Sequence, residues 1–348
     1  MSMRRFNPNS LDATVPHSLN PGDLLAVFSP SWAGPNLFPL RFGRGLRKLH
    51  ALGFRTIVSA HASANVDGKA GTVRQRAEDL EALFCDTHVK AIIASIGGDD
   101  ARTLVPLIDW EAVARHPKWF IGYSDTTALQ CALLSKAGMA SLYGPTVMTD
   151  FAELPNMPIQ SEMSFLKSVC DNSFPSIGVV ESLYEEGPDW ASQNAQEALR
   201  RSVKATAPFV SGSGIAHGRV VGGCIESLVE LVCSSGGVCF SAGAGDILLL
   251  ESSRQRLSAE ALAKQLETLS ACIDFSSLEG IVFGAKCWNS SDYEIVAMQL
   301  ANACAKESMP MVIGLPFGHI TPCLTVALGI NYRLDLSELS NPKLIAAL

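Results

Sequence analysis

Short apolar runs alternate with amphipathic stretches along the first part of the chain. A continuous apolar run is typical of a buried strand, and apolar residues that recur every three or four positions are typical of a helix. Repeated strand–helix units of this kind predict a parallel sheet with helices on both faces. Strands are expected at residues 24–28, 56–58, 91–94 and 119–121, and amphipathic segments at residues 37–49, 73–85, 102–108 and beyond residue 124.

The alternation breaks down between residues 150 and 210, where five prolines and a polar stretch at residues 185–204 predict a linker with an excursion. The 348 residues suit two domains, since a domain commonly has about 100–200 residues. We predict an α/β protein with an N-terminal domain at residues 1–165, a linker and cleft-covering loop at 166–210, and a C-terminal α/β domain at 211–348. In the C-terminal domain, strands are expected at residues 247–250, 280–283 and 311–313, and helices at 258–269 and 293–305.

Composition narrows the classes of function. The formal net charge of -7 argues against a nucleic-acid-binding surface, which needs a basic face. There is no run of 18 apolar residues, so no membrane span is expected. Residues 1–21 lack the apolar core of a secretory signal. The ten cysteines occur singly, without a C-x-x-C pair, which argues against a disulfide framework or a zinc site and favours a reducing, cytoplasmic location.

Ser124 is the first candidate for chemistry. It lies between the apolar run at residues 119–121 and a helical pattern that includes Leu129 and Leu133. A serine at such a strand-to-helix turn is held clear of the sheet, next to free N–H groups at the start of the helix that can bind an oxyanion. This is the usual position of a nucleophile in an α/β enzyme. The alternative is that Ser124 is only a helix N-cap, because serine is a preferred N-cap residue.

A serine nucleophile needs a base and a group that orients the base. His319 closes a glycine-rich loop directly after the strand at 311–313, and Glu251 follows the apolar run at 247–250. Ligand sites in α/β sheets form at the carboxyl ends of strands. Ser124, Glu251 and His319 would form a triad if the three strand ends converge on a cleft between the domains. The alternatives are an ordinary turn histidine and an acidic residue that begins a loop.

The loop Ser95-Ile96-Gly97-Gly98-Asp99-Asp100 also follows a predicted strand. Paired glycines let backbone N–H groups approach a ligand closely. The loop lacks the spacing of a phosphate-binding fingerprint, and its aspartates would repel a phosphate. A role in an oxyanion hole, with the Asp125 N–H as the second donor, fits better.

Five motifs occur in a characteristic order along the chain, and they are Gly97-Gly98-Asp99-Asp100, Gly122-Tyr123-Ser124-Asp125, Gly222-Gly223, Leu250-Glu251 and Gly318-His319. In this order they resemble the motifs of the LD-carboxypeptidase family of serine peptidases. This family includes the murein tetrapeptide LD-carboxypeptidases and the microcin C self-immunity proteins. The resemblance extends from about residue 21 to residue 335.

The resemblance implies a two-domain hydrolase with a Rossmann-like N-terminal sheet and a site in the interdomain cleft. By the resemblance, Ser124 is the nucleophile, His319 the general base and Glu251 its orienter, while Gly98 and Asp125 donate the oxyanion-hole N–H groups. The family uses no metal or cofactor, and its members are commonly cytoplasmic homodimers. The chain departs from the family at three places, which are Cys224 in place of a frequent asparagine, Ser252 in place of an acidic residue, and Ala327-Leu328-Gly329 in place of a Pro-x-Gly.

The resemblance leaves the substrate open. The segment at residues 184–190 resembles an insertion of the microcin-immunity branch, where a tryptophan can stack on a nucleobase, so Trp190 and Gly97 are the expected substrate-binding residues. Alternatively, Trp190 packs its own loop. A muropeptide is the second candidate substrate, and its terminal carboxylate would require a basic group such as Arg254 or Lys286. A non-catalytic α/β protein that binds a small ligand is the third reading.

Overall fold

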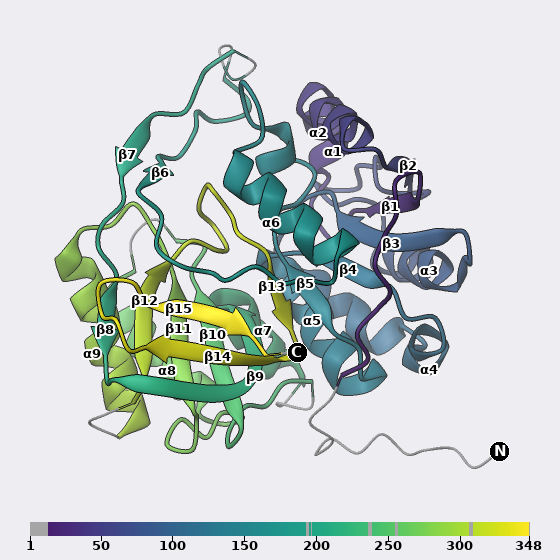
Figure 1. Cartoon of the computed structure of the whole chain (residues 1–348). Helices are drawn as coiled ribbons and strands as arrows, with labels where there is room; N and C mark the ends of the chain where they lie inside the picture. The colour runs from purple at the N-terminus through teal and green to yellow at the C-terminus, as the bar shows by residue number, and fades with distance from the viewer. Residues whose placement is uncertain are drawn as a thin grey trace.

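The computed structural model describes residues 13–347, apart from residues 193, 194, 196, 236–238, 255, 256 and 306–308. Two large β-sheets lie side by side, each with its own helices (Figure 1). The N-terminal sheet is mostly parallel and the C-terminal sheet is mixed and curled. The predicted α/β class is therefore confirmed.

The N-terminal sheet has the strand order β13-β5-β4-β3-β1-β2. All neighbouring pairs are parallel except β13 and β5, which are antiparallel. The predicted strands are present, and β2 is a partly exposed edge strand. The strands are β1 (Leu24–Phe28), β2 (Arg55–Val58), β3 (Val89–Ala94), β4 (Trp119–Gly122), β5 (Ser141–Tyr143) and β13 (Val326–Leu328).

The helices of this half follow the predicted periodicity with three local differences. The amphipathic segment at 37–49 is split by a helix start at Pro39, because proline suits the first turn of a helix. The segment at 102–108 is a 3₁₀ helix with Pro106 inside it. The short α4 after it was not predicted. The elements are α1 (Gly34–Leu37), α2 (Pro39–Ala51), α3 (Val73–Cys85), η1 (Ala101–Leu107), α4 (Trp110–Ala114), η2 (Ser124–Thr126) and α5 (Thr127–Ala137).

The C-terminal sheet has the order β15-β14-β9-β10-β11-β12-β8. Strands β9 to β12 are parallel neighbours, and β8, β14 and β15 are antiparallel additions at the two edges. The strands are β8 (Phe209–Ser211), β9 (Gly214–Cys224), β10 (Asp246–Glu251), β11 (Gly280–Gly284), β12 (Met311–Leu315), β14 (Asn331–Leu336) and β15 (Lys343–Ala346).

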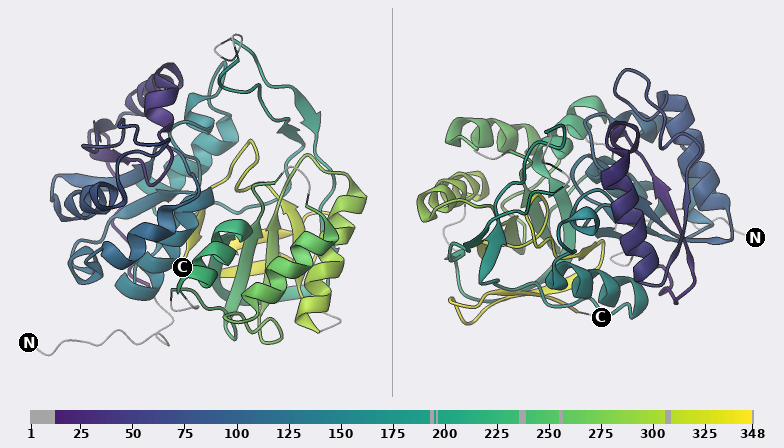
Figure 2. Two further views of the ribbon diagram at one scale, coloured as in Figure 1. Left: turned by 180° about the vertical axis from the view of Figure 1, so that it is seen from behind. Right: turned by 90° about the horizontal axis from the view of Figure 1, so that it is seen from above.

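Helices cover one face of this sheet, as the green ribbons of Figure 2 show. Alternate residues of β10 explain the layering. Leu248 and Leu250 belong to the apolar cluster that these helices share, whereas Ile247 and Leu249 pack in a second cluster on the opposite face. The helices are α7 (Ile225–Ser235), α8 (Ala259–Leu269) and α9 (Ser290–Cys304).

The segment predicted as an irregular linker contains more structure than expected. A 3₁₀ turn and a full helix precede a small antiparallel pair of strands, which arches beside the loop that follows β12 (Figure 1). The helix escaped the sequence pattern because prolines flank it closely, at positions 155, 158 and 175. The elements are η3 (Asp150–Ala152), α6 (Ile159–Cys170), β6 (Ser182–Tyr184) and β7 (Ser202–Lys204).

Candidate active site

Three side chains that the sequence places at strand ends meet at one point of the structure. Ser124 lies just beyond β4, Glu251 is the last residue of β10, and His319 lies in the loop after β12. The Oγ of Ser124 is 3.0 Å from Nε2 of His319. The Nδ1 of the same ring is 2.8 and 3.0 Å from the two carboxylate oxygens of Glu251. The structure therefore joins all three residues in one chain of hydrogen bonds.

Ser124 has a left-handed backbone, with φ of 67°. This conformation is uncommon for a residue other than glycine, and it costs on the order of 1–3 kcal/mol, so the surrounding structure must impose it. Neither η2 nor α5, both fully described, receives a capping hydrogen bond from the Ser124 side chain. The hydroxyl is instead directed at His319, an arrangement that simple helix capping does not account for.

Glu251 is buried, with 1% of its surface exposed, and its carboxylate is fully engaged. The Tyr143 hydroxyl donates to Oε1 at 2.6 Å, and the His319 backbone N–H donates to Oε2 at 3.2 Å. A Cβ at Gly318 would lie 2.4 Å from Cγ of Glu251, so only glycine fits there.

The pKa of Glu251 reflects this environment. Burial by itself would raise the pKa of the carboxyl. The charge and hydrogen bond of His319 outweigh burial, with smaller contributions from the Lys286 charge and the Tyr143 hydroxyl, and lower the pKa to about 2. Glu251 is therefore ionised at neutral pH and suited to orient the imidazole.

Tyr143 is a site residue that the sequence reasoning missed. It is the last residue of β5 and pairs in register with Gly122 of β4, which brings its hydroxyl under the Ser124 turn. Besides donating to Glu251, the hydroxyl accepts from the Ser124 N–H at 3.4 Å. The signal that could have revealed it is the short run Leu142-Tyr143-Gly144, an apolar strand end closed by glycine after the α5 pattern.

The predicted glycine loop lies against Ser124. A Cβ at Gly97 would be 3.0 Å from the Ser124 Oγ and 3.4 Å from the Asp125 backbone nitrogen. A Cβ at Gly98 would be 2.1 Å from the Ser31 Oγ. Both glycines are therefore required by close approach, which brings loop backbone next to the serine hydroxyl.

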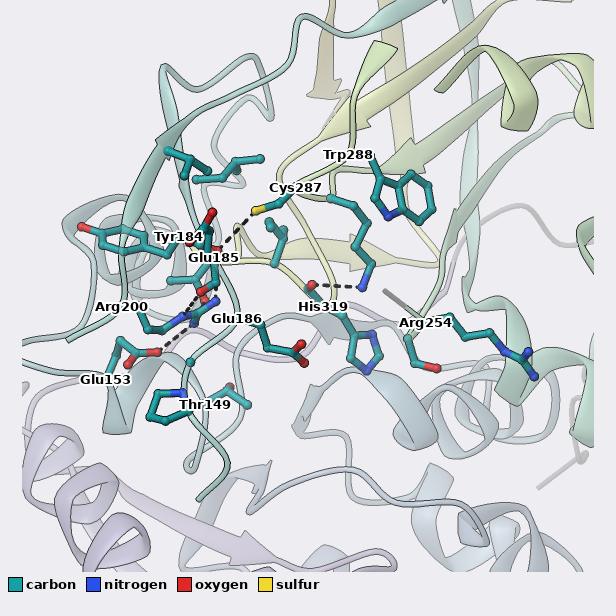
Figure 3. A pocket seen from close by; sticks show the side chains of 18 of the residues that line it. Thr149, Glu153, Tyr184, Glu185, Glu186, Arg200, Arg254, Cys287, Trp288 and His319 are labelled. Carbon is teal, nitrogen blue, oxygen red and sulfur yellow. Dashed lines mark hydrogen bonds and ion pairs between the residues drawn. The ribbon is translucent and has the colours of Figure 1, made fainter. Parts of the chain in front are cut away.

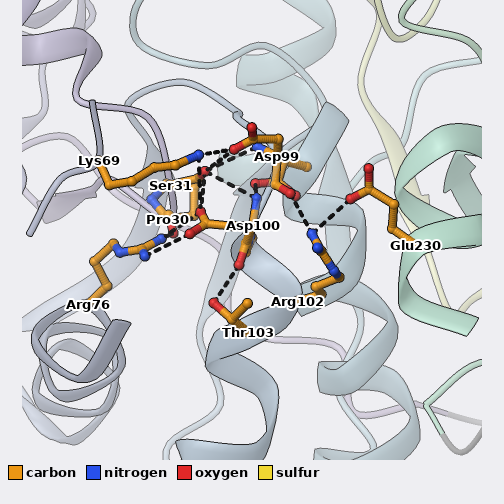
Figure 4. A network of polar contacts seen from close by, with 11 residues as sticks. Pro30, Ser31, Lys69, Arg76, Asp99, Asp100, Arg102, Thr103 and Glu230 are labelled. Carbon is orange, nitrogen blue, oxygen red and sulfur yellow. Dashed lines mark hydrogen bonds and ion pairs between the residues drawn. The ribbon is translucent and has the colours of Figure 1, made fainter. Parts of the chain in front are cut away.

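Ion pairs and hydrogen bonds hold this loop in place (Figure 4). The Asp125 carboxylate accepts from the backbone N–H groups of Asp100 at 3.0 Å and Ala101 at 2.9 Å. Burial raises the pKa of Asp125 to about 6. Arg76 donates to both oxygens of Asp100, at 2.9 and 3.0 Å, and Ser31 donates to the same carboxylate at 2.5 Å. Asp100 is therefore paired within the protein, which explains an acidic residue in a loop that approaches the site.

The glycine pair before Cys224 marks the contact between the two halves. A Cβ at Gly223 would lie 2.7 Å from the Thr127 side chain and 3.0 Å from the Tyr143 ring. The Cys224 N–H donates to Thr127 Oγ1 at 3.1 Å. The end of β9 thus packs tightly against the start of α5. Because β10 pairs with β9, this contact also fixes the position of Glu251, the last residue of β10, relative to Ser124.

Two of the three departures from the family meet at Glu226. The Cys224 thiol donates to Glu226 Oε2 at 3.1 Å, and the Ser252 hydroxyl donates to Glu226 Oε1 at 2.6 Å. The Arg254 N–H in turn donates to Ser252 Oγ at 3.1 Å. Cys224 and Ser252 therefore form one hydrogen-bonded cluster next to the triad residues. The third departure, Ala327-Leu328-Gly329, covers the end of β13 and the glycine that follows it.

A cavity of about 1590 Å³ opens over His319. Its wall comes from loops and helices of both halves and from the segment between them, and it includes the β6 and β7 residues Tyr184 and Val203. Figure 3 shows Glu186 and Arg254 on opposite sides of the His319 ring. The Lys286 ammonium also lines the cavity and donates to the His319 carbonyl at 3.2 Å. Burial lowers the pKa of Lys286, while Glu251 counteracts this.

Trp190 lines the same cavity and is half-buried. Its ring centroid lies 5.9 Å from that of Trp32 and 5.7 Å from that of Phe38, and the Arg41 guanidinium lies 4.3 Å from it. Trp190 therefore lines the cavity and also packs in an aromatic cluster with two residues of the N-terminal half. Arg200 and Glu153 line the same cavity and form an ion pair at 2.9 Å.

A serine, a histidine and a buried glutamate in hydrogen-bond contact, at the junction of two α/β lobes and below a cavity, define a serine hydrolase. The chain belongs to the LD-carboxypeptidase family of serine peptidases. Residues 25–144 match the LD-carboxypeptidase N-terminal domain, and residues 217–334 match the LD-carboxypeptidase C-terminal domain. The predicted family and enzyme class are confirmed, so the reading as a non-catalytic binding protein falls away.

Individual relatives cover almost the whole chain. The microcin C7 self-immunity protein MccF of Escherichia coli is 28% identical over 326 residues, 91% of this chain and 92% of its own. The murein tetrapeptide carboxypeptidase of Pseudomonas aeruginosa is 26% identical over 277 residues, 79% of this chain and 81% of its own. A structure of MccF in complex with glutamyl sulfamoyl guanosine superposes with a TM-score of 0.84 at 26% identity, and covers 95% of this chain and 98% of that one.

Within the described ranges, no helix is both long enough and apolar enough to pass through a bilayer.

Proposed function

We propose that this enzyme hydrolyses an amide bond near the C-terminal end of a small peptide or peptidyl-nucleotide, through an acyl-enzyme on Ser124. The observation that carries the proposal is the hydrogen-bonded chain from Ser124 through His319 to Glu251 at the edge of a cavity of about 1590 Å³. The cavity exceeds the roughly 300–1,000 Å³ of common ligand pockets, so it has room for a peptide joined to a second bulky group.

The proposed reaction follows from the geometry. With Nδ1–H donated to Glu251, the His319 Nε2 carries a lone pair and takes the Ser124 proton as Oγ attacks the carbonyl carbon. The imidazolium then gives that proton to the departing amine nitrogen, and the C–N bond breaks. Water, deprotonated by the same nitrogen, cleaves the ester, releases the acid and restores Ser124. Ionised Glu251 stabilises the imidazolium during both steps.

The oxyanion would be held by the backbone N–H groups of Gly98 and Asp125. A Cβ added at Gly97 would lie only 3.0 Å from the Ser124 Oγ, and this closeness supports the assignment because it places the glycine loop beside the reacting atom. Removing one such donor in other serine hydrolases costs about 10²–10³ in kcat. Because the left-handed Ser124 backbone fixes the turn, both donors would be in place before substrate binds.

A peptidyl-nucleotide is the preferred substrate because Trp190 lines the cavity beside the triad residues. The MccF relative has been solved with glutamyl sulfamoyl guanosine, an aminoacyl-nucleotide analogue. By the proposal, Trp190 and Gly97 contact the ligand, Trp190 at the base and Gly97 at the reacting end.

A murein tetrapeptide is the second candidate. Lys286 and Arg254 line the cavity on the side of His319, where they could bind the terminal carboxylate of a D-alanine. The murein tetrapeptide carboxypeptidase relative belongs to the same family. The homodimer and the cytoplasmic location stay predictions from the resemblance.

One experiment separates the two substrates. The pure protein is incubated with a murein tetrapeptide and with a peptidyl-aminoacyl-nucleotide, and products are identified by mass spectrometry. Cleavage of the second alone supports the peptidyl-nucleotide proposal, whereas release of D-alanine alone establishes the muropeptide reading. Ser124→Ala is the control, and product formation that survives this change on both substrates would overturn the serine mechanism.

A further inference from the structure

Cys224 lies beside two of the triad residues for a reason of topology. Strands β9 and β10 are parallel neighbours, and Cys224 and Glu251, their last residues, are paired in register. Side chains at paired positions of adjacent strands point to the same face of a sheet. His319 approaches that face from the loop after β12. As a result the Cys224 sulfur, a Glu251 carboxylate oxygen and a His319 ring nitrogen all lie within 4.8 Å of one another.

We propose that Cys224, Glu251 and His319 form a binding site for a thiophilic divalent cation such as Zn²⁺, which inhibits the enzyme reversibly. The inhibitory effect rests on the proposed function, whereas the binding of the cation does not. The cation has no part in the hydrolytic reaction and competes with it.

The donor set is the first support. Thiolate sulfur, imidazole nitrogen and carboxylate oxygen are the three ligand types that bind Zn²⁺ in proteins, at about 2.0–2.3 Å. In a tetrahedral site those bond lengths put donors roughly 3.3–3.8 Å apart. Donors within 4.8 Å of one another therefore need to close by only about 1 Å, which small side-chain rotations provide.

A carboxylate next to Cys224 can take up the proton that the thiol loses when a metal binds. Binding converts the Cys224 S–H into a metal-bound thiolate and releases one proton, since the metal ligand is the thiolate. The thiol already donates to Glu226 Oε2 at 3.1 Å, so this carboxylate can accept the proton and pass it to solvent. Burial and the charges of Glu251 and Glu226 raise the pKa of the Cys224 thiol, and the cation has to displace the thiol proton against this effect. The same two carboxylates attract a divalent cation electrostatically.

Access to the site is from the cavity. Cys224 and Glu251 are each 1% exposed, but 22% of the His319 side chain is exposed, and this residue lines the cavity wall. A cation would therefore meet the imidazole first and then draw in the two buried donors. A metal-bound ring nitrogen has no lone pair for a proton, and the ring can no longer bridge Ser124 and Glu251. Hydrolysis must stop while the cation is bound.

Binding is tested with Cd²⁺, which reports directly on sulfur through the ultraviolet charge-transfer absorption of cadmium thiolates. The full-length protein, C224S and H319A are titrated with Cd²⁺ and, by calorimetry, with Zn²⁺. Loss of a group that only orients a metal ligand weakens binding about 10–100-fold, so we expect at least about tenfold weaker binding in both variants. C287S is the matched control, because Cys287 is an exposed cysteine of the same cavity, and it should keep the tight site.

Inhibition is tested separately on a substrate that the enzyme cleaves, each variant being compared with its own metal-free rate. Zn²⁺ should inhibit the natural sequence and C287S, chelator should restore the rate, and C224S should require at least about tenfold more Zn²⁺. Equal Cd²⁺ and Zn²⁺ affinity in C224S and the natural sequence would overturn the proposal, with thermal unfolding confirming that C224S is folded. Metal binding that depends on Cys224 in a protein inactive on every substrate would instead overturn the proposed function and leave the site standing.

Discussion

The hydroxyl of Tyr143 donates a hydrogen bond of 2.6 Å to Oε1 of Glu251, and both residues are fully buried. The same hydroxyl accepts from the Ser124 N–H, so a single oxygen from β5 connects the orienting carboxylate with the backbone of the nucleophile turn. Tyr143 does not line the cavity, and we interpret it as a positioning residue that acts through Glu251 and Ser124.

Tyr143→Phe tests this interpretation. A hydrogen bond to a charged group is worth about 1.5–3 kcal/mol, and 1.4 kcal/mol corresponds to a factor of ten, so kcat should fall by about 10–100-fold with little change in KM. Loss of the donor should also raise the pKa of Glu251 in the folded protein, so less folding stability should be lost on acidification below pH 4.5 than in the natural protein. The measurements are steady-state kinetics at neutral pH and urea unfolding across pH.

Tyr332→Phe is the matched control for that change. Tyr332 is equally buried, and its hydroxyl accepts from the Ala327 N–H at 3.0 Å, away from the triad residues. It should lower stability at every pH without changing the amount of stability that is lost on acidification. If both variants lose the same activity and keep the natural pH dependence of stability, the role of Tyr143 is structural only.

Ser124→Ala should abolish hydrolysis while the fold persists, because no acyl-enzyme can form. Loss of a triad nucleophile costs on the order of 10⁶ in kcat. His319→Ala should be about as damaging, and Glu251→Ala less so, since triad members act as a unit in which the orienting acid can be the least costly to lose. The checks are single-turnover rates, circular dichroism and labelling by a fluorophosphonate probe, which should reach Ser124 alone. Near-normal turnover in Ser124→Ala would remove the serine mechanism.

Glu251→Gln gives a prediction for acid stability. The pKa of Glu251 is about 2 in the folded protein against an ordinary 4.5. A lowered pKa means that the ionised group stabilises the fold fully above pH 4.5, and that this stabilisation is lost as the pH falls from 4.5 towards 2. The free energy of unfolding of the natural protein should therefore decline relative to Glu251→Gln in that window, by at most about 1.4 kcal/mol per pH unit. Urea unfolding at a series of pH values measures this, and parallel curves would contradict it.

Trp190→Ala distinguishes the substrates. Stacking of an aromatic ring on a base is worth roughly 1–3 kcal/mol, so KM for a nucleotide-bearing substrate should rise by about 10–100-fold, with muropeptide hydrolysis barely changed. Trp32→Ala is the matched control, because Trp32 packs in the same aromatic cluster without lining the cavity. Equal losses on both substrates in Trp190→Ala would indicate a structural role for the tryptophan. No loss on either would favour the muropeptide reading.

The sequence located the strand ends well because each is a short apolar run closed by a polar or glycine residue. Ser124, Glu251 and His319 could be placed in this way, since a strand end depends on local pattern alone. The β-α alternation also predicted the parallel N-terminal sheet, although β5 was missed, and it predicted an α/β C-terminal domain. The helix α6 was missed because helical periodicity is hard to recognise in a proline-rich stretch, where context decides the structure.

The parts that could not be predicted depend on packing between distant segments. The position of Tyr143 beneath Ser124 follows from the pairing of β5 with β4, and the contact of Cys224 with Glu251 follows from the register of β9 and β10. A local sequence pattern does not determine the order of strands in a sheet or their register. The left-handed backbone of Ser124 is likewise imposed by the fold, since serine alone does not favour it.

The strand β13 is translated long after the other strands of its sheet, and this order has a consequence for incomplete chains. The sheet that precedes Ser124 is completed at its edge by Val326–Leu328, a strand that is translated after every other strand of that sheet. His319 is also translated late, only a few residues earlier. A chain that ends before residue 319 would lack His319 and would leave β5 as an open edge of the sheet. By the proposed mechanism, such an incomplete product of translation would be inactive.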